Sequence, residues 1–267
     1  MGYLSMKGKA AVVAAAAVFV LAVAQLQTAA YAAEFDYFVL ALQWPGNSCR
    51  NISSCCPDNG CCPGYGRTHA PNQFTIHGLW PEYDDEDSKW PSCCSDERFD
   101  PKAISPLNWI ILSEVWPSYR CDSETTCNGE KSSFLAAQYE KHGTCAAPII
   151  KGQYEYFTKA TTLYTKYDVT KVLNDAGIVA SVAPYPIMYI LDELRRAFHA
   201  MPKITCAEDG VVKEIWLCFD KDFNPRNCAF SLSCPTFVRL LPTDVPDFEP
   251  VGEGAIPRMA KIAQVVI

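Results

Sequence analysis

Two short segments of the 267-residue chain carry side chains suited to proton transfer. The first reads Phe-Thr-Ile-His-Gly-Leu-Trp-Pro from residue 74 and contains His77, and the second contains Lys141 followed directly by His142. The unperturbed pKa of an imidazole lies near neutrality, so two imidazoles can serve as general base and general acid. A neighbouring ammonium can stabilise negative charge that develops on a phosphate. The two segments therefore predict acid–base chemistry at a phosphate group.

The second segment is expected to form a helix over residues 134–142. Ser133 can cap its start, and Gly143 stands where such a helix would end. Residues three and four positions apart share a face of a helix, so Leu135 and Tyr139 can dock together into a core. The other stripe carries an amide, an ammonium and an imidazole, and its members are Phe134, Ala137, Gln138, Lys141 and His142. Such a stripe fits a catalytic surface, but it fits an ordinary solvated surface equally well.

The first segment is expected to be a short strand. Apolar and polar residues alternate over residues 74–77, which places His77 on the polar face. Gly78 allows a close approach or an unusual backbone angle, and Trp80-Pro81 is expected to end the strand. One imidazole on a strand and another at the end of a helix favour paired chemistry over two unrelated structural histidines.

Together the two segments resemble the active-site segments of the ribonuclease T2 family, and of its plant S-like branch in particular. The motifs that carry this resemblance are Ile-His-Gly-Leu-Trp-Pro at residues 76–81 and Glu-Lys-His-Gly-Thr-Cys at residues 140–145. The similarity extends to residues 38–46 and to the cysteine spacing as far as Cys234. It therefore covers most of the chain.

The resemblance implies cleavage of single-stranded RNA by transphosphorylation, without a metal or any other cofactor. His142 would take the proton of the ribose 2′-hydroxyl, and His77 would protonate the departing 5′-oxygen. Lys141 would stabilise the charge on the phosphorane, and the product would be a 2′,3′-cyclic phosphate. The resemblance also suggests three substrate-binding positions: Gln43 and Phe134 match positions that contact a base, and Trp80 matches an aromatic residue of the site. Core packing is the alternative for each of these three.

The chain departs from the family pattern one helical turn before Lys141. Active members carry His-Glu where this chain has Ala137-Gln138. Ala137 supplies no polar group, whereas Gln138 keeps the shape and an acceptor oxygen and stays among the candidate catalytic residues. Losing one well-placed stabilising group typically lowers the rate by about 10²–10³, and two coupled losses by about 10³–10⁵. The sequence therefore predicts an endoribonuclease with weakened activity.

Two other classes of function compete with this interpretation. The first is a catalytically inactive protein that kept the fold and serves in storage, in RNA binding or in partner binding, and Ala137 favours it. The second is a Ser-His-Asp or metal-dependent hydrolase. The chain lacks a Gly-x-Ser-x-Gly motif and histidines with metal-ligand spacing, which argues against this second class.

The N-terminus is typical of an exported protein. Residues 1–33 combine Lys7 and Lys9, an apolar run and a small-residue stretch, which indicates a secretory signal peptide rather than a membrane anchor. They carry two of the 23 basic residues and none of the 30 acidic ones, so the rest of the chain has a net charge of −9. Bulk electrostatic binding of long nucleic acid is therefore disfavoured. We expect a monomeric glycoprotein with its sequon at Asn51, in the extracellular space or the vacuole.

Fourteen cysteines in an exported chain indicate up to seven disulfides. A metal site is a minor alternative. Zinc-binding cysteines are usually separated by about two other residues, whereas these cysteines include directly adjacent pairs. The pattern alone leaves the pairing open. The family resemblance implies five bridges: Cys49–Cys55, Cys56–Cys121, Cys94–Cys145, Cys206–Cys234 and Cys218–Cys228. Four further cysteines could then form two more: Cys61, Cys62, Cys93 and Cys127.

The expected fold is α+β, with an antiparallel sheet packed against several helices as in ribonuclease T2 proteins. Strands are predicted at residues 35–44 and 211–219, with the first of them central in the sheet. Helices are predicted at residues 105–115, 153–167, 169–174 and 186–199. The aromatic stripe of the second helix, which includes Tyr154 and Phe157, is expected to be core rather than a platform for bases.

One domain is expected over residues 34–240, because no repeat or second domain is visible in the sequence. His69 and His199 lie outside both motifs, and His199 is expected to be exposed at a helix end. Residues 241–267 form an extension, which is either weakly packed or a cleaved vacuolar sorting peptide.

Overall fold

The computed structural model describes residues 34–50, 60–62, 70–85, 89–105, 107, 109–229 and 233–243. Several expectations from the sequence lie outside these residues: the signal peptide, the sequon at Asn51, His69 and nearly all of the C-terminal extension.

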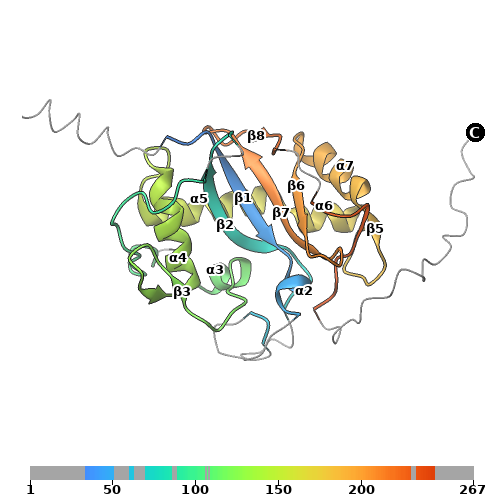
Figure 1. Cartoon of the computed structure of the whole chain (residues 1–267), viewed down its shortest axis with the longest axis horizontal. Helices are drawn as coiled ribbons and strands as arrows, with labels where there is room; N and C mark the ends of the chain where they lie inside the picture. Colours follow the sequence, from blue (N-terminus) through green and yellow to red (C-terminus); the bar gives the residue numbers. More distant parts are fainter. Residues whose placement is uncertain are drawn as a thin grey trace, which may run out of the picture.

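The fold is built on an antiparallel sheet, as the sequence predicts. Its strands are β1 (Tyr37–Gln43), β2 (Thr75–Glu82), β6 (Lys203–Cys206), β7 (Val212–Phe219) and β8 (Pro225–Arg226). The strand order is β2-β1-β7-β6, and β8 also pairs with β7 (Figure 1). β1 is therefore internal, and β2, which carries His77, lies at an edge.

The helices and minor strands lie around this sheet. The helices are α2 (Pro45–Ser48), α3 (Trp109–Val115), α4 (Phe134–Lys141), α5 (Gly152–Lys166), α6 (Val169–Asp175) and α7 (Ile187–Phe198). Two small ribbons pair β3 (Glu124–Thr125) with β4 (Lys131–Ser132) and β5 (Tyr185–Pro186) with β9 (Phe237–Val238). Figure 1 shows α5 and α6 behind the sheet and α4 beside the β2 edge. The α+β class is thereby confirmed.

The two faces of the sheet have different roles. All seven residues of β1 are buried, and side chains alternate between faces along a strand. Phe38, Leu40 and Leu42 join the large core that the helices complete. Val39 and Ala41 face the other way and form a small second cluster with Trp80, Cys218 and their neighbours. The second face is thus left for the functional side chains.

Aromatic side chains hold the outer edge of β2. The indole of Trp116 donates to the carbonyl of His77 at 2.9 Å, and the hydroxyl of Tyr156 donates to that of Leu79 at 2.9 Å. Buried carbonyls need such partners, because leaving one unpaired is costly. Trp80-Pro81 do not end the strand as predicted, since β2 continues to Glu82. The reason is that β2 is an edge strand, where a proline is tolerated.

Two helix expectations require correction, one for α3 and one for α5, whereas Gly143 lies just beyond the end of α4, as expected. Gly143 begins a 3₁₀ turn, Gly143–Ala146, and a Cβ at this position would lie 2.4 Å from the ring of Tyr139. α3 begins only at Trp109. In α5 the ring of Tyr154 is exposed, and that of Tyr156 is buried in its place. The capping of α4 by Ser133 and the burial of Tyr139 are confirmed.

The disulfides confirm most of the implied pairing and correct one bridge. Cys94–Cys145, Cys206–Cys234 and Cys218–Cys228 form as expected, and Cys93–Cys127 is an additional bridge. Cys49 pairs with Cys61 rather than with Cys55. The Cα atoms of Cys49 and Cys61 lie 5.5 Å apart, which is an ordinary separation for a disulfide. Cys62 and Cys121 are also disulfide-bonded. Cys56, which was the expected partner of Cys121, lies outside the described residues.

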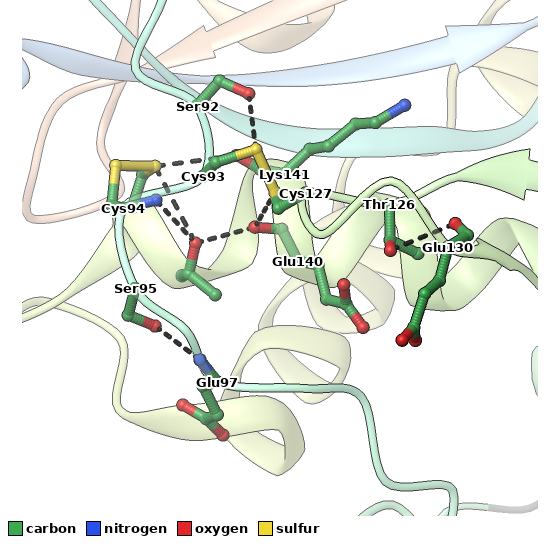
Figure 2. Close-up of a disulfide and its surroundings, with 12 residues drawn as sticks. Ser92, Cys93, Cys94, Ser95, Glu97, Thr126, Cys127, Glu130, Glu140 and Lys141 are labelled. Carbon is green, nitrogen blue, oxygen red and sulfur yellow. Dashed lines mark hydrogen bonds between the residues drawn. A yellow bond between two sulfur atoms is a disulfide. The ribbon is translucent and has the colours of Figure 1, made fainter.

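Two neighbouring disulfides hold the C-terminal turn of α4 (Figure 2). The backbone N–H of Cys93 donates to the carbonyl of Lys141 at 2.9 Å. The N–H of Cys94 donates to the Thr144 hydroxyl at 3.1 Å, and that hydroxyl donates to the carbonyl of Glu140 at 2.8 Å. In Figure 2 the Lys141 side chain points away from the disulfides. The clamp therefore fixes the backbone of the turn, while the Lys141 side chain extends away from it.

Replacing Cys93 and Cys127 with serine should lower the free energy of unfolding by about 4 kcal/mol, because the bridge closes a loop of 34 residues in the unfolded chain. Urea denaturation followed by tryptophan fluorescence would measure this loss. Hydrogen exchange of the His142 amide should also accelerate. The matched control is the double substitution Cys206→Ser/Cys234→Ser, which removes a bridge on β6, at the edge of the sheet opposite β2, and should leave this amide protected. Equal protection of the amide in both variants would contradict the clamp.

Candidate active site

His77 reaches the second face of the sheet through a bulge in β2. The register between β1 and β2 shifts there, since Ala41 pairs with Gly78 and Leu42 with Ile76. A bulge places one extra residue in the strand and re-aims its side chain. The imidazole remains about a third exposed, and its Nδ1 lies 2.5 Å from the Oε1 atom of Glu214.

Glu214 projects from β7, two strands away from His77. Its other carboxylate oxygen, Oε2, accepts a hydrogen bond of 2.8 Å from the indole of Trp216. Burial raises the pKa of this carboxyl, but the hydrogen bonds and charge of His77 and the bond from Trp216 outweigh burial and lower it below its usual value. Glu214 is therefore an anion at neutral pH.

His142 lies at the C-terminal end of α4, where its backbone N–H still donates to the carbonyl of Gln138. Its Nδ1 atom is buried and has no hydrogen-bond partner among the residues that the structure describes. Burial lowers the pKa of this imidazole to about 3, and the positive charges of His77 and Lys141 act in the same direction. His142 is therefore neutral at physiological pH, which is the protonation state that a general base requires.

Trp80 lies between the two imidazoles. Its ring centroid is 5.0 Å from that of His77 and 5.4 Å from that of His142. The indole N–H donates to the Oε1 atom of Gln138 at 3.0 Å, which links β2 to α4. One buried indole thus sets the separation of the two histidines, although they belong to different elements.

The two residues that depart from the family pattern are both buried. Ala137 is 1% exposed and offers no polar group. Gln138 is 7% exposed, and its acceptor oxygen is occupied by Trp80. Gly78 makes this contact possible, since a Cβ there would lie 2.0 Å from the Trp80 nitrogen and 2.3 Å from the Gln138 oxygen. The structure therefore places Gln138 where it supports the indole.

The remaining predicted residues differ in how directly they face the site. Phe134 stacks on His77, with ring centroids 5.7 Å apart and planes inclined by 25°. Lys141 is partly buried, and its ammonium forms no ion pair within the described part of the chain. Gln43 is buried, and its amide donates to the carbonyls of Ile76 at 3.3 Å and Pro117 at 3.5 Å. Its amide nitrogen is therefore engaged within the fold.

The sequence interpretation missed Glu214 and Trp216. A signal was present, because a carboxylate directly precedes the apolar run of β7 and shares a face with Trp216 by strand alternation. What the sequence lacked was the strand order that brings β7 next to β1 and within reach of β2. His199, by contrast, is exposed at the end of α7, as expected.

Two other features of the described residues bear on function. No three His, Cys, Asp or Glu side chains among them converge in a way that could hold a metal ion. In the same residues, no helix combines the length and the apolar character needed to cross a membrane.

The comparisons with known proteins agree with this geometry. "Ribonuclease 3" of Arabidopsis thaliana is 34% identical over 76% of this chain and 86% of that protein. Trichomaglin, described as a novel S-like ribonuclease, is 51% identical, with a TM-score of 0.72 over 78% of this chain and 98% of that one. An RNase-related protein from Calystegia sepium is 39% identical, with a TM-score of 0.69 over the same shares of the two chains.

The family model that describes the Ribonuclease T2 family matches residues 35–228, which include every candidate site residue named above. With its sheet, its disulfides and the two histidine segments, this chain belongs to the ribonuclease T2 family.

Proposed function

We propose that this chain is an endoribonuclease with reduced activity, which cleaves single-stranded RNA by transphosphorylation through a 2′,3′-cyclic phosphate. The observation that carries the proposal is the arrangement of two imidazoles around the ring of Trp80. His142 is neutral, which is the protonation state of a base, whereas His77 has one ring nitrogen engaged by a carboxylate and the other available. Relatives that are named ribonucleases support the same reaction.

In the proposed reaction, His142 removes the proton of the ribose 2′-hydroxyl, and the resulting oxygen attacks phosphorus. The bond between phosphorus and the 5′-oxygen then breaks, and His77 gives a proton to the departing oxygen. The Lys141 ammonium faces the phosphorane oxygens and stabilises their charge. Trp80 and Phe134 flank the imidazoles, and Gln43, Trp80 and Phe134 form the surroundings of the bound nucleotide.

The reduced activity follows from residues 137 and 138. A buried methyl group at Ala137 cannot hold a phosphate oxygen, and the neutral amide of Gln138 is already engaged with Trp80. We expect a rate about 10³–10⁵ below that of a family member with both groups, because residues that act as a unit are not additive. Typical enzymatic accelerations of about 10⁶–10¹⁷ leave room for measurable turnover.

The proposal includes the context in which the chain acts. The disulfides of the described residues fit an oxidising compartment, and they support export to the extracellular space or the vacuole. The proposal takes the exported chain to be a monomer. Without residues 1–33 the chain carries a net charge of −9, so its contact with RNA is local rather than spread along the phosphate backbone.

A second candidate is a T2-fold protein without catalysis, which serves in storage or binds RNA or a partner. The observation that favours it is the full burial of Ala137, which leaves a methyl group where active members carry an imidazole. The neutral His142 and the paired His77 are more than such a role requires, so we place this candidate second.

Cleavage of a fluorescent dinucleotide by the purified chain should be slow, should disappear in His142→Ala, and should rise at least about 10²-fold in Ala137→His/Gln138→Glu. His199→Ala serves as the matched control, because it removes an exposed imidazole at the end of α7 and should change nothing. Absence of cleavage in the native chain, with recovery in the double variant, would establish the second candidate instead. Circular dichroism of each variant checks that the fold is retained.

The pH dependence of kcat/KM should show an unusually low acidic limb. His142 is inactive as a base when protonated, so activity rises as the pH passes its pKa of about 3 and is complete well below the ordinary histidine value. The rates at about pH 4.5 and pH 6 should therefore be similar on the acidic side of the profile. An acidic limb near pH 6 in a chain that stays folded would contradict the assigned burial of His142.

A further inference from the structure

β7 carries a carboxylate on the face where the large helical core does not lie. Glu214 lies between Lys213 and Ile215 on the strand, and its side chain is 17% exposed. Such burial is unfavourable unless the charge has partners. Both oxygens have one: Oε1 lies 2.5 Å from the Nδ1 atom of His77, and Oε2 accepts from the indole of Trp216 at 2.8 Å. The carboxylate is therefore held from two sides.

The contact between Glu214 and His77 spans an intervening strand. β1 lies between β2 and β7, so the backbones of the two outer strands are about 10 Å apart. The small side chain of Ala41 faces the same side between Gly78 and Trp216, which leaves room for the imidazole and the carboxylate to meet above β1. The bulge at His77 turns the ring toward this space. Three strands thus cooperate to form one hydrogen bond.

This hydrogen bond decides which ring nitrogen of His77 can act on a substrate. Nδ1 is directed at the carboxylate, so Nε2 is the atom left for proton transfer. The opposite side of the carboxylate is fixed by Trp216, whose ring also contacts Trp80 at a centroid distance of 5.5 Å. Glu214 therefore cannot rotate away from His77 without losing its second bond.

We propose that Glu214 is the positioning residue of the general acid: it holds the Nδ1–H of His77, aims Nε2–H at the departing 5′-oxygen and balances the charge of the imidazolium. This inference rests on the proposed ribonuclease function and deepens it. When phosphorus and the 5′-oxygen separate, the oxygen keeps the electron pair of that bond and takes the proton from Nε2. His77 is then neutral with its remaining proton on Nδ1, and Glu214 stays ionised throughout.

A purely structural role for Glu214 leads to a different expectation. If the carboxylate only stabilised the packing of β7, its loss would affect every reaction of the enzyme alike. If it acts through the general acid, its loss should matter only where the leaving group needs a proton. A 5′-alkoxide needs one, whereas 4-nitrophenolate leaves readily without protonation.

The test compares Glu214→Gln with the native chain on a dinucleotide and on a nucleoside 3′-(4-nitrophenyl phosphate). Glutamine keeps the shape and an acceptor oxygen but removes the charge. We expect kcat on the dinucleotide to fall about 10- to 100-fold with little change in KM, and kcat on the aryl ester to change less than about threefold. Glu82→Gln is the matched control, because Glu82 lies on β2 without contacting His77 and should leave both rates unchanged. Equal losses on both substrates would overturn the inference.

A measurement without turnover separates this inference from the proposed function. Histidine ¹⁵N–¹H NMR should show His77 protonated at Nδ1 in the native chain, and Glu214→Gln should mix the two tautomers. If the native chain cleaves neither substrate but the tautomer is fixed as described, the proposed function fails and the positioning by Glu214 stands. If the tautomer of His77 is the same in both proteins, the positioning fails whatever the activity.

Discussion

The hydrogen bond from the indole of Trp80 to the amide of Gln138 is the constraint on which the site depends. His77 belongs to the edge of a sheet and His142 to the end of a helix, so nothing local fixes the distance between them. The ring of Trp80 lies between the two imidazoles. Its hydrogen bond to Gln138 holds α4 in place along β2. Gly78 is part of the same constraint, because any side chain there would occupy the space in which the bond forms.

The same hydrogen bond shows what Gln138 still does in place of the glutamate of active family members. A glutamine can accept the indole proton as well as a carboxylate can, so the scaffold around both histidines survives without the charge. The chain has therefore separated two properties that one acidic residue can combine, which are support for Trp80 and stabilisation of the transition state. The first is retained in Gln138, and the charge that the second would use is absent. Ala137 has no such compensation, because a buried methyl group replaces a polar one.

The fold class, the internal position of β1 and both histidine segments were predictable, because each depends on a local pattern or a motif. Glu214 was not, since its role depends on the order of strands that lie more than 130 positions apart. The burial of Gln138 and the exposure of Tyr154 were also out of reach, because helical periodicity gives the faces but not the partner of each face. The pairing of Cys49 with Cys61 was out of reach as well, because the spacing of cysteines does not fix which of them pair.

The aromatic groups along the outer edge of β2 have a consequence for the behaviour of the chain in concentrated solution. An edge strand with free carbonyls is a template on which another chain can add its own strand. Here Trp116 and Tyr156 occupy the carbonyls of His77 and Leu79, and Tyr164 occupies that of Phe74 just before the strand. The strand that carries His77 can therefore lie at the margin of the sheet without promoting edge-to-edge aggregation.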